Sequence, residues 1–151
     1  MNAPASHASP AFHALERLVL SMPMAQTLGL TFTRIAPGDV EVEIPVLDAF
    51  TFRPGQLQAT PVFAIGDFAA VAAAGTTLPP GWINATVDAT LKLIAPAQGV
   101  ALRARGRVID AGKLLTVCAA DVYAVAQDGK ETLCATLLGT ARNIDMNPRP
   151  R

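Results

Sequence analysis

The sequence has few of the residues on which small proteins build metal, redox or nucleic-acid sites. Its 151 residues include two cysteines, two histidines and one tryptophan, and only 16% are charged. Twelve basic and twelve acidic side chains leave a formal net charge of zero. Nucleic acids and anionic membranes are bound through clustered positive charge, so we expect neither as a partner.

The scarce cysteines and histidines also narrow the chemistry. Cys118 and Cys134 each lie in an apolar run, which favours buried thiols over a disulfide, a redox site or a metal ligand. Both histidines, His7 and His13, lie near the N-terminus, so a zinc site or a Ser-His-Asp triad would have to use that segment. The sequence therefore predicts no metal site and no such triad.

Targeting and membrane signals are also missing. The first ten residues lack a basic region followed by an apolar core, which argues against a signal peptide. The longest apolar run is interrupted by Gly66 and Asp67, which argues against a transmembrane helix. We therefore expect a cytoplasmic protein without membrane contact.

Apolar side chains are what the sequence has in excess, at 51% of its residues. A chain of this length can bury about 70% of its unfolded surface in one core, so we expect a single domain. Such a composition leaves few polar side chains to cover the outside, which indicates that part of the apolar surface is buried against another copy. We expect a homodimer, or a dimer of such dimers.

The hydrophobic patterning predicts an α+β architecture, with one long antiparallel sheet around one central apolar helix. Ser9 and Pro10 are typical of a helix start, and the chain 60–74 reads as a second helix ended by Gly75. Alternating residues predict strands at 31–35, 40–44, 82–94, 100–109, 114–125 and 132–142. The expected organisation is a flexible lead at 1–10, one domain at 11–143 and a frayed tail at 144–151.

Asp67 is the residue that most needs an explanation. It is the only ionisable residue between Arg53 and Asp88, and it lies in the middle of the most apolar predicted helix. An unpaired buried carboxylate costs several kcal/mol, so it needs a structural partner or a chemical role. The structural interpretation is a cap or an ion pair; the functional one is a general base or nucleophile facing a cleft.

The start of the same helix offers a second reactive element. The backbone N–H groups near Ala59 and Thr60 point out of the helix N-terminus, where an oxyanion or carbonyl oxygen can bind. Ala59 and Asp67 are eight residues apart, which is about 12 Å along a helix and too far to flank one reacting carbon. If both act on one substrate, they must come from different subunits.

Three segments of the chain form a pattern by their order and spacing: the run from Arg53-Pro54-Gly55 to Asp67, the strand Thr86-Val87-Asp88 ending at Ala95-Pro96-Ala97, and Gly112-Lys113-Leu114-Leu115. In this pattern the chain resembles the hotdog-fold acyl-CoA thioesterases of the phenylacetate-pathway (PaaI-like) type. The resemblance spans about residues 25–143. It implies a hotdog fold and hydrolysis of a medium-chain or aryl acyl-CoA thioester between two subunits, with coenzyme A as part of the substrate and no separate cofactor.

The resemblance also implies roles for individual residues. It implies that Asp67 activates water or attacks the thioester, that the Ala59 amide binds the oxyanion, and that Thr86 assists. Gly55 and Asp67 match the family motif. Four residues depart from it: Phe52 stands at an Asn, Gln58 at a His, and Ala59 and Thr60 at a Gly pair. The catalytic candidates are thus Asp67, Ala59, Gln58 and Thr86, with Gly55, Thr60 and Phe52 as candidates for substrate binding.

Arg103, Arg105 and Arg107 alternate along one strand and allow two interpretations. They form a solvated face or pair with Glu41 and Glu43, or they bind the nucleotide phosphates of coenzyme A. The second interpretation adds Arg103, Arg105 and Lys113 to the substrate-binding candidates. Lys113 is first of all part of a hairpin turn.

Two other functions remain open besides a thioesterase. A binding protein for acyl-CoA or another acyl ligand, without catalysis, agrees with the residues that replace the family's Asn and His. A hotdog hydratase or dehydratase ordinarily needs a histidine near the acid, and no histidine follows residue 13.

Overall fold

A computed structural model describes residues 9–149, so most of the expected lead, with His7, and the end of the expected tail lie outside the described residues. The helices are α1 (Pro10–Leu20), α2 (Pro23–Leu28), the short 3-10 helix η1 (Asp48–Phe50) and α3 (Ala59–Gly75). The strands are β1 (Thr31–Ala36), β2 (Asp39–Pro45), β3 (Thr51–Arg53), β4 (Gln56–Leu57), β5 (Trp82–Leu93), β6 (Ala101–Ala111), β7 (Leu115–Val125) and β8 (Glu131–Asp145).

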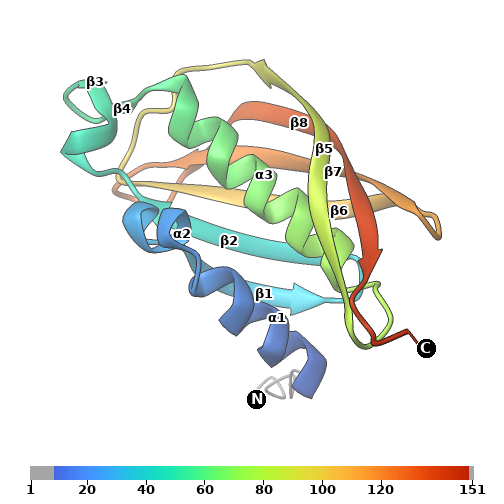
Figure 1. Ribbon diagram of the computed structural model, residues 1–151. Helices are drawn as coiled ribbons and strands as arrows, with labels where there is room; N and C mark the ends of the chain where they lie inside the picture. The colour runs from blue at the N-terminus through green and yellow to red at the C-terminus, as the bar shows by residue number, and fades with distance from the viewer. Residues whose placement is uncertain (1–8, 150–151) are drawn as a thin grey trace, which may run out of the picture.

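Six strands form one antiparallel sheet in the order β1-β2-β6-β7-β8-β5, and α3 lies across one of its faces (Figure 1). This confirms the predicted architecture. The core fills the space between α3 and the sheet, where Val62, Ile65 and Ala69 pack against strand residues such as Leu102 and Leu137. Alternating strand residues point away from α3 and form the outer face of the sheet.

Gly106 allows α3 to approach β6 closely. A Cβ atom at this position would overlap the backbone carbonyl of Ala69, so only glycine fits between the helix and this strand. Because Gly106 points toward α3, its neighbours Arg105 and Arg107 point to the outer face.

The N-terminal helices follow the capping signals of the sequence. Ser9 caps α1 by accepting a hydrogen bond from the N–H of Phe12 at 3.4 Å, as predicted. Pro23 begins α2, which ends at Gly29 with a left-handed φ of 70°. A hairpin of β1 and β2 then joins the sheet beside β6.

The end of α3 differs from the prediction. Gly75 is the last residue of the helix and has no positive φ, and Thr76 forms the cap in a right-handed helical conformation. The Thr76 hydroxyl donates to the carbonyl of Ala73 and accepts from the N–H of Gly38, both at 2.7 Å. A threonine side chain, rather than a left-handed glycine, therefore terminates the helix.

Two further boundaries differ. The expected loop before α3 contains the two-stranded hairpin β3–β4, and β8 continues to Asp145, three residues beyond the predicted strand end at Arg142. Asn143 explains the longer strand, because its side chain is buried and donates to the carbonyl of Gly112 at 2.9 Å and to the Thr116 hydroxyl at 3.0 Å. The last strand therefore runs two residues past the expected domain end at residue 143.

The sheet covers only one side of α3. The opposite side carries Phe63, which is exposed, and Ala64, Phe68 and Val71, which are half-buried. α1 lies beside the C-terminal half of α3 and beside β1 (Figure 1). The expectation that its own chain wraps this apolar helix on every side is therefore only partly met. Among the described residues, no helix is long and apolar enough to cross a membrane.

Candidate active site

Asp67 lies at the middle of α3, on the flank that faces β5. Its carboxylate accepts a hydrogen bond from the Thr86 hydroxyl at 2.9 Å. Within residues 9–149, no cationic side chain forms an ion pair with it. Burial raises the pKa of Asp67 above its ordinary value, and the hydrogen bond from Thr86 offsets only part of this. The structure thus joins two of the predicted catalytic residues around a carboxylate without a counter-charge.

The local geometry of β5 explains how Thr86 reaches this carboxylate. Thr86 pairs with Ala141 of β8, whose side chain is fully buried under α3, so Thr86 points to the same inner face. The register shifts between Thr86 and Asp88, which indicates a β-bulge at Val87. Bulges redirect side chains and increase the local twist of a strand.

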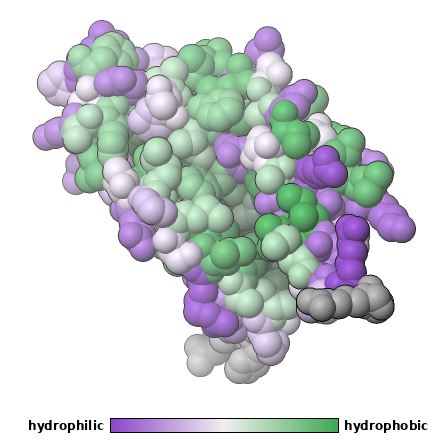
Figure 2. All heavy atoms as spheres, viewed as in Figure 1, coloured by the Kyte–Doolittle hydropathy of each residue, from purple (hydrophilic) through white to green (hydrophobic). Residues whose placement is uncertain are grey.

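Asp67 and Thr86 line a cleft of about 680 Å³ between α1, α3 and the first half of β5. Among the described residues that line it, Asp67 is the only charged one, and most of the others are apolar. Hydrophobic side chains gather along the middle of the face seen in Figure 2, over these same elements. Concave apolar sites with one or two polar groups are typical of small-molecule binding.

A second group of predicted site residues lies at the start of α3. Gln58, Ala59 and Thr60 are exposed there, and the Gln58 side chain forms no capping hydrogen bond. The first N–H groups of an α-helix have no partner within the helix, so they are available to a ligand. Eight residues separate Ala59 from Asp67 within one continuous helix, which is about 12 Å.

The hairpin β3–β4 precedes this helix start. Gly55 occupies its turn with a φ of 74°, a conformation that favours glycine. Phe52 is 60% exposed, and the Arg53 guanidinium lies 5.4 Å from the centre of its ring. Phe52 and Gly55 therefore belong with the helix start and not with Asp67 of the same chain.

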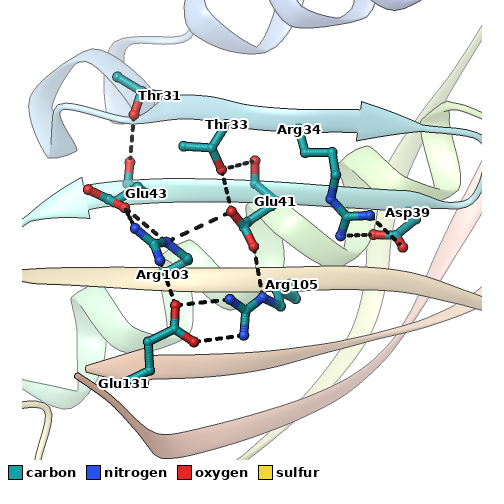
Figure 3. A network of polar contacts seen from close by, with 9 residues as sticks. All are labelled: Thr31, Thr33, Arg34, Asp39, Glu41, Glu43, Arg103, Arg105 and Glu131. Carbon is teal, nitrogen blue, oxygen red and sulfur yellow. Dashed lines mark hydrogen bonds and ion pairs between the residues drawn. The ribbon is translucent and has the colours of Figure 1, made fainter. Parts of the chain in front are cut away.

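Arg103 and Arg105 lie on the outer face of the sheet, among acidic side chains (Figure 3). This face is opposite to α3, which carries Asp67. Arg103 donates two hydrogen bonds to Glu43, at 3.0 and 2.7 Å. Arg105 donates to Glu41 at 2.7 Å, and both arginines contact Glu131. The structure thus favours the pairing interpretation over phosphate binding, and it places both arginines away from Asp67 of their own chain.

Lys113 lies in the exposed turn between β6 and β7. It lines a smaller hollow of about 310 Å³, and Trp82 lines both this hollow and the cleft of Asp67. Lys113 is therefore beyond the far end of the cleft from Asp67 and does not touch the carboxylate.

The two cysteines are buried, as predicted. Burial raises the pKa of both Cys118 and Cys134 to about 11, so each thiol stays protonated near neutral pH. No group of three or more metal-ligating side chains occurs in the described part of the chain.

The sequence interpretation gave α1 no role, yet this helix supplies one wall of the cleft. Its lining residues recur at a spacing of three and four residues and include Ala11, Ala14, Leu15 and Leu18. That spacing was visible in the sequence as an amphipathic pattern. It did not indicate what the apolar stripe would face.

Solved structures provide the comparison with known proteins, since no protein-family model and no curated protein sequence matches the chain. A thioesterase family protein from Silicibacter pomeroyi is 30% identical, with a TM-score of 0.84 over 89% of this chain and 98% of that chain. A phenylacetic acid degradation-related protein from Ralstonia eutropha is 28% identical, with a TM-score of 0.73 over 87% and 98%.

The PaaI protein from the phenylacetic acid degradation operon of Escherichia coli shares the fold at 19% identity, with a TM-score of 0.75 over 89% of this chain and 93% of that chain. The similarities at 30% and 28% extend over nearly the whole of both partners. Together with the sheet and the central helix, the match at 30% shows that the chain belongs to the hotdog-fold thioesterase family, in which it resembles the PaaI-like members.

Proposed function

We propose that two copies of the chain form an acyl-CoA thioesterase site, with Asp67 and Thr86 from one copy and the Ala59 N–H and Gln58 from the other. The observation that carries this proposal is a half-buried carboxylate, bonded only to a hydroxyl, on the wall of an apolar cleft. A buried acid without a counter-charge is the pattern expected of a catalytic group.

The edge of the sheet supports the pairing of two copies. Among the described residues, β5 pairs on one side only, with β8. Its exposed apolar side chains include Val87 at 56% and Leu93 at 58%. An unpaired, apolar edge strand is a ready surface for a second strand. A two-fold axis at this edge, perpendicular to the sheet, would pair the two β5 strands and extend the sheet from one copy into the other.

The direction of α3 relative to β5 allows the helix start of one copy to approach Asp67 of the other. Thr86 contacts Asp67, and Asn84 donates to the carbonyl of Val71 at 3.0 Å, so α3 and β5 run in opposite directions. If the two β5 strands pair antiparallel, the start of the partner's helix approaches the middle of β5. An Ala59 amide from one copy can then face Asp67 of the other. Pairs of such dimers can associate further, and we retain a dimer of dimers as an expectation.

In this site Asp67 acts as general base or as nucleophile. As a base, it takes a proton from water; the hydroxide attacks the thioester carbon, the C–S bond breaks, and the thiolate of coenzyme A takes up a proton. As a nucleophile, it attacks the same carbon and the C–S bond breaks, so that the thiolate leaves and takes up a proton; water then hydrolyses the acyl anhydride to the free acid and the Asp67 carboxylate. In both routes the Ala59 N–H stabilises the negative charge on the carbonyl oxygen. Gln58 and Thr60 add polar groups beside that oxygen, while Gly55 shapes the hairpin and Phe52 offers an apolar contact.

The shared site can be tested by mixing two inactive variants. Ala59→Pro removes the N–H, and proline suits the first position of a helix, where Gln58 already has the extended conformation (φ −65°, ψ 163°) that a following proline requires. We expect Ala59→Pro to lower kcat about 10²- to 10³-fold. After mixed refolding with Asp67→Asn, half of the dimers pair the two variants and contain one intact site, so about a quarter of wild-type turnover returns.

Ala59→Ser is the matched control, because it keeps the N–H and should keep most of the turnover. Free thiol release from a panel of acyl-CoAs gives the rates. If the mixture is no more active than the separate variants, the amide and the carboxylate do not serve one shared site.

Phe52, at the position where the family has an amide side chain, favours a second candidate function. A phenyl ring cannot hold or orient water, so a protein that binds acyl-CoA without hydrolysing it fits this residue. Such a protein would raise its melting temperature with acyl-CoA. It would release no thiol.

A further inference from the structure

The cleft that contains Asp67 extends well beyond this reactive group. On α3, its lining recurs at helical spacing along one stripe: Asp67, Phe68, Val71, Ala72 and Gly75. The eight residues from Asp67 to Gly75 correspond to about 12 Å along the helix. The cleft is therefore a groove that starts at the carboxylate and follows the second half of α3.

The opposite wall of the groove is α1. Leu18 of α1 and Met22, which follows the helix, line this wall and are 49% and 40% exposed. Folded proteins rarely leave apolar spaces much larger than a water molecule, so a groove of about 680 Å³ is suited to a ligand. Near its far end α1 and α3 meet: a Cβ atom on Gly75 would lie 3.1 Å from Cδ1 of Leu15. The two helices thus narrow the groove at this point, and the loop at 78–81 that follows α3 lines its end.

We infer that this groove receives the acyl chain and that α1 is the wall that limits its length. The inference rests on the proposed function, because it places the thioester carbon at Asp67 and the alkyl end toward Leu15 and Gly75. An extended chain of about eight to ten carbons spans 12 Å, since C–C bonds are about 1.5 Å and the zigzag shortens each step.

The lining of the groove also restricts the acyl groups that it can bind to uncharged ones. Within residues 9–149, no lysine, arginine or histidine lines the groove. A carboxylate at the far end of a dicarboxylic acyl group would lose its water there without gaining a counter-charge. The expected substrates are therefore straight, uncharged monocarboxylic acyl-CoAs of medium length.

Binding of S-alkyl thioethers of coenzyme A, measured by titration calorimetry, tests this inference without any hydrolysis. We expect affinity to rise about four-fold per methylene, as for burial of apolar groups, and to level off near ten carbons. A decyl thioether with a terminal carboxylate should gain almost nothing over the ethyl thioether.

Ala14→Phe probes the wall directly, because Ala14 is an exposed residue of α1 that lines the groove. The ring should weaken binding of the decyl thioether about ten-fold or more, the equivalent of about two buried methylenes, and leave the ethyl thioether unchanged. His13→Phe is the matched control, since its side chain does not line the groove. It should leave both affinities as they are.

Three results would overturn the inference: affinity that does not depend on chain length, equal binding of the carboxylated analogue, or equal effects of Ala14→Phe and His13→Phe. The experiments distinguish failure of this inference about the groove from failure of the proposed thioesterase function. Hydrolysis of acyl-CoAs without chain-length dependence removes the groove from substrate binding but leaves the thioesterase. Length-dependent binding without thiol release leaves the groove and removes the hydrolase.

Discussion

Carboxylates on the two sides of the sheet have opposite pKa shifts, because their bonding partners differ. On the outer face Glu131 contacts two arginines, and its hydrogen bond from Arg105 holds the pKa of Glu131 below the usual value. On the inner side Asp67 is bonded only to a hydroxyl, and burial raises its pKa. One acid is stabilised as an ion, and the other is destabilised as an ion.

Glu41 shows that the partner matters more than the burial. Burial raises its pKa, yet hydrogen bonds from Arg105 and Thr33, with the nearby charges of Arg105 and Arg103, outweigh this and lower it overall. Asp67 is also desolvated by burial, and no guanidinium among the described residues offsets it. Paired acids of the outer face contribute to stability, whereas the unpaired acid of the cleft remains free to exchange protons with a substrate or water.

The largest expected effect comes from neutralising the unpaired acid. Asp67→Asn should lower kcat/KM for a medium-chain acyl-CoA about 10³-fold, because asparagine can neither take a proton nor attack the thioester, although it can still accept the Thr86 hydrogen bond. The release of free coenzyme A thiol, followed at substrate concentrations well below KM, measures the loss of kcat/KM. Asp121→Asn applies the same change to an acid bonded to Arg107 on the outer face and should leave kcat/KM unchanged. Equal turnover by wild type and Asp67→Asn would remove Asp67 from the mechanism.

A smaller effect is expected from the hydroxyl that bonds to Asp67. Thr86→Val should lower kcat/KM about ten-fold and shift the acidic limb of its pH profile to higher pH. The sign follows from the hydrogen bond: Thr86 lowers the pKa of Asp67, so its loss raises that pKa and leaves less carboxylate at a given pH. Thr86→Ser keeps the hydroxyl and should keep the limb in place. A limb that stays in place in Thr86→Val would mean that Asp67 is not the titrating group.

The smallest effects concern stability, and they should have opposite signs on the two faces. At pH 8 Asp67→Asn should raise the free energy of unfolding by about 1 kcal/mol, because it removes an ion that burial destabilises. Glu131→Gln should lower it by about 1 kcal/mol or less, since the solvent screens these half-exposed ion pairs. Urea unfolding monitored by the fluorescence of Trp82 measures both.

The pH dependence provides a check on these signs. The gain in Asp67→Asn exists above the raised pKa of Asp67 and disappears as the pH falls toward 3.8, where the unfolded carboxyl also binds a proton. The loss in Glu131→Gln is present above the ordinary value of 4.5 and disappears as the pH falls through the lowered pKa. Effects of the same sign at pH 8 would contradict the contrast between the two faces.

Local sequence patterns predicted the elements but not all of their ends. Ser9 and Pro10 marked the start of α1, and alternation placed the strands within a few residues. The end of β8 was missed because Asn143 looks like a surface residue until Thr116 and Gly112 supply its hydrogen-bond partners. The end of α3 was missed because Gly75 suggested a left-handed cap, while the Thr76 hydroxyl supplies the cap instead.

The candidate site shows the same division. Asp67 stood out because a lone acid in an apolar helix is costly wherever the helix packs, and Thr86 came from the resemblance to a family. The opposite placement of Arg103 and Arg105 depended on which face of β6 the helix covers. The alternation of apolar and polar residues along β6 cannot decide which face α3 covers, because the same pattern results whichever face is inside.

The sequence by itself determined that one carboxylate would lie within an apolar helix, and that the helix start would be too far away to share its substrate. Both follow from covalent connectivity and the fixed rise of a helix. Only the tertiary structure decided that this carboxylate has a hydroxyl instead of an arginine beside it, and that α1 turns its surroundings into a groove. Those features depend on segments far apart in the chain, which meet only when the sheet, α3 and α1 pack together.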